Sequence, residues 1–233
     1  MKLGRNLTVK IRFILDELVP PILRDQYWFM ALPVKFVFGK KADIFLHFKE
    51  RAKFMTDKQF SKVYEEIEPY IIQRGTDLNT QCMNKIPQDI KGRSVLEVGS
   101  GRGLLAIKLS KKYDVTASDI VRDEMLAKKW PNIKFRKAKI ESLPFKSSSF
   151  DTVVCTHTLE HVLDLQKAIS ELRRVARKRI IIVVPKQRPY KYTFDLHIHF
   201  FPNPESLLTA MDYKKNAACK VVGGDLYYIE DKI

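Results

Sequence analysis

From residue 94 onward, short apolar runs alternate with segments in which apolar residues recur every three or four positions. Short runs rich in β-branched residues predict buried strands, and the longer spacing predicts helices that cover them. We expect strands at 94–98, 115–118, 133–135, 152–156 and 179–184, and helices at 104–112, 122–129, 162–175 and 204–211. Strands separated by helices indicate a parallel sheet that is covered on both faces, and therefore the α/β class.

Two further short strands are expected at 219–222 and 225–230. They flank Gly223-Gly224, a pair typical of a hairpin turn. Residues 1–92 lack a strand pattern and instead predict helices at 7–18, 43–54 and 56–68, the last ending at Pro69. The chain is thus predicted to consist of an all-helical extension, 1–92, and an α/β domain, 93–233, with the polar stretch 76–84 as a linker.

The composition limits the environment of the protein. Its 233 residues allow one domain of ordinary size plus an extension. Cys82, Cys155 and Cys219 are odd in number and lack metal-ligand spacing, which favours a reducing compartment. A signal peptide and a bilayer-spanning apolar run are not expected from the pattern. These features predict a cytoplasmic protein or one that is peripheral on the inner face of a membrane.

The net charge of +15 favours an anionic partner. RNA, a phospholipid surface and a phosphorylated substrate all satisfy this condition, and a solvated basic surface is the alternative without a partner.

Three glycines follow the strand at 94–98 at alternate positions, Gly99, Gly101 and Gly103, and Glu97 precedes them. Glycine permits positive φ angles and close approach of a ligand to the backbone, and the helix that follows presents unpaired N–H groups. The segment resembles motif I of the class I S-adenosylmethionine (SAM)-dependent methyltransferases, acidic-x-Gly-x-Gly-x-Gly. The dinucleotide-binding pattern spaces its glycines differently. A merely structural strand-to-helix turn is the alternative.

This resemblance implies SAM as the cofactor and places the hairpin at the antiparallel end of a Rossmann-like, doubly wound sheet. It implies that the backbone of residues Gly99, Ser100, Gly101 and Gly103 lies against the methionine moiety, with Glu97 in the same region. Asp119, at the end of the next strand, would accept hydrogen bonds from both ribose hydroxyls, since two carboxylate oxygens suit a cis-diol. Ile120 would lie beside the adenine. The alternative for Asp119 is a helix N-cap.

A further resemblance, to the UbiE-like (methyltransferase type 11) group, rests on Leu143-Pro144-Phe145, on Phe150-Asp151 and on the segment from Cys155 to His161. In that group an acidic residue reads the adenine amino group, whereas this chain has Lys139, which cannot accept that hydrogen bond. We therefore expect adenine recognition by the main chain of Lys139 and Ile140, with Thr156 as a further cofactor-binding residue. Asp151 is expected to be structural.

Methyl transfer from a sulfonium mainly requires alignment of the acceptor, but an oxygen acceptor also benefits from a base such as histidine. Of the five histidines, His157 and His199 are predicted as catalytic because each follows a strand of the sheet. No metal is expected. Asp195, His197 and His199 form the alternative ligand set.

Residues 18–56 resemble N-terminal segments of bacterial methyltransferases associated with surface-polysaccharide synthesis. The likeness implies O-methylation of a glycan, a lipid-linked glycan or another small molecule. Aromatic residues at 27–38 with Lys35, Lys40 and Lys41 predict either core packing or contact with an anionic membrane. An RNA methyltransferase is supported by charge, although no RNA-binding module is evident. A non-catalytic SAM-binding regulator or subunit is the third alternative, motivated by Lys139.

Overall fold

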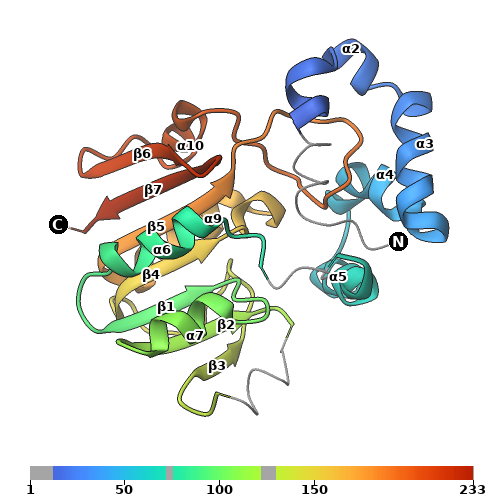
Figure 1. Cartoon of the computed structure of the whole chain (residues 1–233). Coiled ribbons are helices and arrows are strands. Elements are labelled where there is room, and N and C mark those ends of the chain that lie inside the picture. The colour runs from blue at the N-terminus through green and yellow to red at the C-terminus, as the bar shows by residue number, and fades with distance from the viewer. Residues whose placement is uncertain (1–12, 72–75, 122–129, 233) are drawn as a thin grey trace. The chain divides into compact units, whose positions relative to one another are not determined.

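The computed structural model of the chain describes residues 13–71, 76–121 and 130–232 (Figure 1). The helix predicted at 122–129 and the start of the one predicted at 7–18 lie outside the described residues. The chain forms two compact units, which we call the helical unit (Met1–Arg74 with Gln187–Phe200) and the sheet unit (Gly75–Lys186 with Phe201–Ile233). The division into domains at 92/93 stays a prediction.

In the described residues, the sheet unit contains a seven-stranded sheet in the order β3-β2-β1-β4-β5-β7-β6. Its strands are β1 (Ser94–Val98), β2 (Asp114–Asp119), β3 (Lys134–Lys137), β4 (Phe150–Thr156), β5 (Ala176–Pro185), β6 (Ala217–Val222) and β7 (Asp225–Asp231). The first five are parallel, and the hairpin of β6 and β7 adds antiparallel to β5. The predicted mostly parallel Rossmann-like sheet with an antiparallel end is confirmed.

Side chains of alternate residues enter two separate apolar cores, one on each face of the sheet. In β5, Ile180, Ile182 and Val184 belong to one core, and Ile181 and Val183 to the other. Helices α9 (Leu165–Val175) and α10 (Pro204–Ala210) cover the first core, and α6 (Thr80–Asp89) and α7 (Leu104–Ser110) cover the second. The two-residue period of a strand explains why so continuous an apolar run serves both faces.

The strand order reverses between β1 and β4. From β1 the chain proceeds to β2 and β3 on one side and then returns to β4 on the other (Figure 1). Loops that leave the carboxyl ends of β1 and β4 therefore diverge, and ligands of open α/β sheets bind at such a point. The short helix η3 (Leu159–His161) follows β4 at this edge.

Helix α6 occupies much of the stretch that the sequence predicted as a linker. Its apolar face is short, with only Cys82 and Ile86 buried, so the helical period is hidden among polar residues. Asn79 begins the helix by accepting the N–H of Cys82 at 2.9 Å. The Asn79 Nδ2 also donates to Val222 O at 3.0 Å and Asp225 Oδ2 at 2.8 Å, which fixes the helix to the β6–β7 hairpin.

The helical unit consists of η1 (Ile14–Leu18), α2 (Pro21–Arg24), α3 (Tyr27–Phe38), η2 (Gly39–Lys41), α4 (Ala42–Ala52) and α5 (Asp57–Ile71). Helix α5 continues past Pro69, where its end was predicted. Met30 and Val34 of α3 are buried, and the Phe38 ring stacks on Phe45 of α4. None of the helices in the described ranges is long and apolar enough to cross a bilayer.

The segment Gln187–Phe200 leaves the sheet unit after β5 and returns before α10. Lys186 and Phe201, at its two ends, pair through an isolated parallel β-bridge. The two ends of this 14-residue excursion are thus held side by side in the sheet unit, while its middle belongs to the helical unit.

Asp151 connects the amino ends of β1 and β4. Its Oδ2 accepts the N–H groups of Arg93 at 2.9 Å and Ser94 at 3.2 Å, and its Oδ1 lies 2.8 Å from Arg177 Nη2 and 3.0 Å from Lys178 Nζ. These donors outweigh burial and hold the pKa of the Asp151 carboxyl well below its usual range. The structural role expected for Asp151 is consistent with this network.

We expect Asp151→Asn to lower the free energy of unfolding by about 1–3 kcal/mol at pH 7. The NH₂ group of asparagine would face N–H groups that now donate to the carboxylate, and those groups would lose their acceptor. A depressed pKa contributes stability above the unfolded pKa, so the difference should shrink below about pH 4. Denaturant titrations at several pH values measure it. Asp114→Asn is the control, because that exposed carboxylate forms an ion pair with the exposed Arg93 side chain, at 3.3 Å. Equal losses in both variants would contradict the role of Asp151.

Candidate functional site

The glycine loop after β1 is fixed to the end of β2. The N–H groups of Gly99 and Ser100 both donate to Ser118 O, at 2.8 and 3.1 Å. The Gly101 N–H donates to Asp119 Oδ2 at 2.8 Å. The three glycines have φ angles of 72°, 48° and 70°, which other residues rarely adopt.

Gly99 and Gly101 are required for different reasons. A Cβ at Gly99 would lie 1.9 Å from Thr158 Oγ1 in the segment after β4, so packing excludes any side chain there. A Cβ at Gly101 would have no heavy atom within 4 Å. The loop is therefore packed on one side and open at Gly101, where a ligand can approach the backbone.

Asp119 uses both carboxylate oxygens within the protein and retains acceptor capacity. Oδ2 accepts from Gly101, and Oδ1 accepts the Val121 N–H at 3.1 Å. Burial raises the pKa of the Asp119 carboxyl, and backbone N–H groups, that of Gly101 first, oppose this shift. Three backbone N–H groups, those of Gly101, Val121 and Ile120, contact the carboxylate, whose two oxygens have four lone pairs and can therefore still accept a donor from a ligand. The bond from the Val121 N–H also forms a local turn of the kind that a helix N-cap makes, the alternative role of Asp119.

Glu97 and Ser100 present buried polar atoms at this loop. Glu97 is 2% exposed, and its Oε2, like the Ser100 Oγ, has no hydrogen-bond partner among the described residues. Burial raises the pKa of the Glu97 carboxyl to about 8, although the Ala106 N–H lowers it in part. A buried carboxylate oxygen without a donor is costly, and a cationic ligand group would supply one. The methionine moiety of SAM carries such an ammonium group, so these residues fit SAM.

Lys139 and Ile140 follow β3 at the same edge. The Lys139 O accepts the Ser142 N–H at 3.0 Å, and its ammonium lies 3.6 Å from Glu141 Oε1. Glu141 is buried and accepts the Leu163 N–H at 3.3 Å. The lysine that departs from the family pattern thus compensates a buried carboxylate. The sequence analysis did not predict this role of Glu141. Its position two residues after Lys139 is the one local feature that could have indicated the ion pair.

His157 lies between two carboxylates and has a strained backbone, with φ of 48°. Its Nε2 is 3.2 Å from Asp225 Oδ2, and its Nδ1 is 3.5 Å from Glu160 Oε1. Burial disfavours the charged ring, but the hydrogen bonds to Asp225 and Glu160 outweigh it and raise the pKa of His157 to about 10. The raised pKa favours the imidazolium form of this ring, which suits its place between two carboxylates. The predicted role as a base stays a prediction.

The structure brings all ten predicted cofactor residues to one edge of the sheet. Glu97, Gly99, Ser100, Gly101, Gly103, Asp119 and Ile120 lie at the ends of β1 and β2, Lys139 and Ile140 follow β3, and Thr156 ends β4. His199 belongs to the helical unit. There, His197 Nδ1 makes a buried hydrogen bond with Gln187 Oε1 and is 4.0 Å from Asp195 Oδ2. His197, a member of the alternative ligand set, thus has a side-chain amide as a partner.

Comparisons with known proteins agree with this geometry. Residues 96–184 match the family model of a methyltransferase domain. UbiE, the ubiquinone/menaquinone biosynthesis C-methyltransferase of Rickettsia bellii, is 38% identical over 100 residues, which cover 36% of this chain and 40% of the relative. The ubiquinone biosynthesis O-methyltransferase of Paracidovorax citrulli is 34% identical over 97 residues, 38% and 41% of the two chains. The chain thus spans about two fifths of the length of these relatives.

A solved structure from Thermotoga maritima has the same fold. It is described as a SAM-dependent methyltransferase, possible histamine N-methyltransferase, with a TM-score of 0.55 and 17% identity over 75% of this chain and 98% of that one. The sheet, the glycine loop and the family match define a class I SAM-dependent methyltransferase domain. Within that class, the segment that matches these relatives is similar to UbiE and to a ubiquinone biosynthesis O-methyltransferase.

We predict that Asp119→Ala weakens SAM binding by about 1–3 kcal/mol, the range for charge-assisted hydrogen bonds. Isothermal titration calorimetry measures the affinity, and thermal unfolding checks that the loop still folds without its Gly101 partner. Asp114→Ala, at the opposite end of β2, is the matched control and should bind SAM normally. Unchanged affinity in Asp119→Ala would remove this residue from the site.

We also predict that SAM binding at pH 7 releases a proton from Glu97. With its pKa near 8, the carboxyl is mostly protonated in the free protein, and a neighbouring ammonium group would favour the ionised form. Affinity should therefore rise between pH 6 and about pH 8. Calorimetry in two buffers with different ionisation enthalpies counts the proton. Its persistence in Glu97→Gln would assign it to another group.

Proposed function

We propose that this protein transfers the methyl group of SAM to a hydroxyl oxygen of a glycan or lipid-linked glycan. The observation that supports methyl transfer is the loop Gly99–Gly103, bound to Asp119 and carrying the unpartnered Oε2 of Glu97. When bound, SAM supplies an activated methyl group and its own leaving group, so the protein mainly positions the acceptor. The proposal needs no metal, and transfer should survive a chelator.

Different residues of the protein would bind the cofactor, accept the proton and position the loop. Glu97, Asp119 and the loop backbone would hold the cofactor through its ammonium and hydroxyl groups. A hydroxyl acceptor must lose its proton as it attacks, and His199 is the base that we favour. His157, whose ring lies between the carboxylates of Asp225 and Glu160, would position the segment after β4.

A glycan acceptor is supported by the resemblance of residues 18–56 to surface-polysaccharide methyltransferases and by the charge of +15, which suits phosphorylated or lipid-borne glycans. A quinone-type acceptor is the second candidate, because both relatives are named for quinone biosynthesis. Their names differ in the atom methylated, carbon in one and oxygen in the other. The family match covers residues 96–184 and none of the helical unit.

Labelling with isotopic SAM tests the proposal. The protein and an Asp119→Ala control are incubated with methyl-labelled SAM and with separated glycan, lipid-linked glycan and quinone fractions, which mass spectrometry then examines. We expect label on a hydroxyl oxygen of the glycan fractions with the unaltered protein alone. Label in the quinone fraction would establish the second candidate. SAM binding without any labelled product would contradict enzymatic function and favour a SAM-binding subunit.

We further propose that the helical unit contacts anionic membranes. On α3, Trp28, Leu32 and Phe36 succeed each other at four-residue intervals and are 62, 72 and 77% exposed. Residues four apart share a helix face, so these three form one apolar stripe. Lys35 and Lys40, both exposed, lie beside it in sequence. Apolar side chains with basic neighbours suit a helix in the interface of an anionic bilayer.

Liposome flotation tests this contact. We expect binding to vesicles with phosphatidylglycerol but not to pure phosphatidylcholine, decreasing with salt because of screening. Trp28→Ala with Phe36→Ala should reduce binding about tenfold or more. Phe54→Ala, an 88% exposed phenylalanine outside α3, is the control and should bind normally. No binding at low salt, or equal losses in both variants, would contradict the membrane contact.

A further inference from the structure

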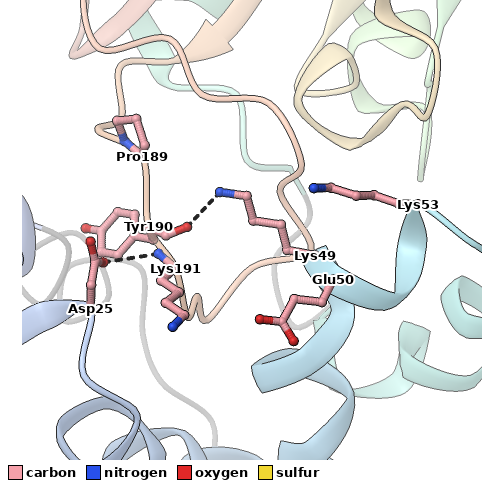
Figure 2. A pocket seen from close by; sticks show the side chains of 7 residues that line it. All are labelled: Asp25, Lys49, Glu50, Lys53, Pro189, Tyr190 and Lys191. Atoms are coloured by element: carbon pink, nitrogen blue, oxygen red, sulfur yellow. Dashed lines mark hydrogen bonds between the residues drawn. The ribbon is translucent and has the colours of Figure 1, made fainter.

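The helical unit contains a pocket of about 340 Å³ (Figure 2). It is lined by Asp25, Lys49, Glu50, Lys53, Pro189, Tyr190 and Lys191. Lys49 and Glu50 come from α4, Lys53 directly follows that helix, and the last three belong to the segment Gln187–Phe200. The volume lies within the range of pockets that hold small molecules.

Hydrogen bonds from three sites fix the wall formed by residues 189–191. Arg24, 2% exposed, donates from Nη2 to Pro189 O at 2.7 Å, and its guanidinium lies 4.1 Å from the centre of the Tyr190 ring. Asp25 Oδ1 accepts the Lys191 N–H at 3.1 Å. Lys49 Nζ donates to Tyr190 O at 2.9 Å (Figure 2). These bonds give the pocket a defined shape before any ligand binds, which reduces the ordering cost of binding.

The charges in the pocket favour an anion beside two acceptors for hydroxyl groups. Figure 2 shows the Lys49 and Lys53 side chains extending in the same direction from the end of α4. Burial lowers the pKa of the Lys49 ammonium, Asp25 opposes this effect, and the charge of Lys53 adds to it. An ammonium group has three donors, and the bond to Tyr190 O uses one. A bound anion would accept the others and offset both the burial and the repulsion.

We propose that this pocket binds a sugar phosphate, with the phosphate at Lys49 and Lys53 and sugar hydroxyls at Asp25 and Glu50. A phosphate carries close to two negative charges at pH 7 and several acceptor oxygens, which matches two ammonium groups. Carboxylates are pure acceptors when ionised and therefore suit hydroxyl donors. The assignment deepens the proposed function by making the acceptor a phosphorylated sugar, and only this link to methyl transfer rests on that function.

Calorimetry on the full chain tests binding directly, with glucose 1-phosphate, inorganic phosphate, glycerol 3-phosphate and glucose as probes at constant ionic strength. We expect glucose 1-phosphate to bind at least fivefold more tightly than inorganic phosphate or glycerol 3-phosphate, and glucose to show no measurable binding. Inorganic phosphate binding as tightly as the sugar phosphate would overturn the sugar assignment. Glycerol 3-phosphate binding most tightly would point to a lipid headgroup and would also overturn it.

Two lysine variants separate the pocket from the overall charge. Lys53→Ala should weaken glucose 1-phosphate binding at least fivefold, because an exposed lysine can be removed without loss of packing. Lys58→Ala, an exposed lysine at the start of α5 and outside the pocket lining, removes the same charge and should change affinity less than twofold. Lys49→Gln should weaken glucose 1-phosphate binding more than Lys53→Ala does, because it removes the half-buried ammonium group. Equal effects of the Lys53 and Lys58 substitutions would overturn the proposal.

Different results would contradict the proposed pocket and the proposed function. Sugar phosphate binding that depends on Lys53 supports the pocket even where labelled SAM leaves all glycan fractions unlabelled, a result that would overturn only the function. Labelled glycans without measurable sugar phosphate binding would overturn the pocket and leave the function intact.

Discussion

The backbone hydrogen bonds between the glycine loop and the end of β2 determine the geometry of the cofactor site. One carbonyl, Ser118 O, accepts two successive N–H groups of the loop, and Asp119 accepts the next. These bonds hold the loop in left-handed conformations that glycine adopts without strain. On its other side the loop packs so closely on Thr158 that Gly99 cannot carry a Cβ. Strands on both sides of β1 thus constrain the loop, while its Gly101 corner stays open.

Two carboxylates lie near opposite ends of β1, and their surroundings shift their pKa values in opposite directions. One of them therefore stabilises the fold and the other is suited to bind a ligand. Asp151 contacts backbone N–H groups and basic side chains at the amino end, and these donors keep it ionised. Glu97, near the carboxyl end, is buried with one oxygen unpartnered, and burial keeps it protonated up to about pH 8. The first carboxylate stabilises the fold without a ligand. No donor among the described residues reaches the second oxygen of Glu97, so a donor group of a ligand would satisfy it, as expected of a binding residue.

The sequence predicted features that depend on neighbours along the chain. The apolar run of β5, the glycine spacing and the hairpin turn are local patterns, and each was found at nearly its predicted place. Features that depend on distant residues were missed. Asp225, 68 residues away, contacts the His157 ring and helps to raise its pKa, and no local pattern predicts that contact. Helix α6 was missed for a related reason, since Asn79 and the hairpin stabilise a segment with a short apolar face.

The boundary of the family match supports a division of labour between the two units. The match ends at residue 184, and at Gln187 the chain leaves the sheet unit. The excursion that follows forms one wall of the pocket in the helical unit that Lys49 and Lys53 line. The Lys186–Phe201 bridge holds the ends of this excursion together, so its middle can change without disturbing the sheet. A shared fold hosts many acceptors through such grafted segments. Under the proposed function, acceptor choice would therefore depend on residues 187–200 and the helices that contact them rather than on the matched domain.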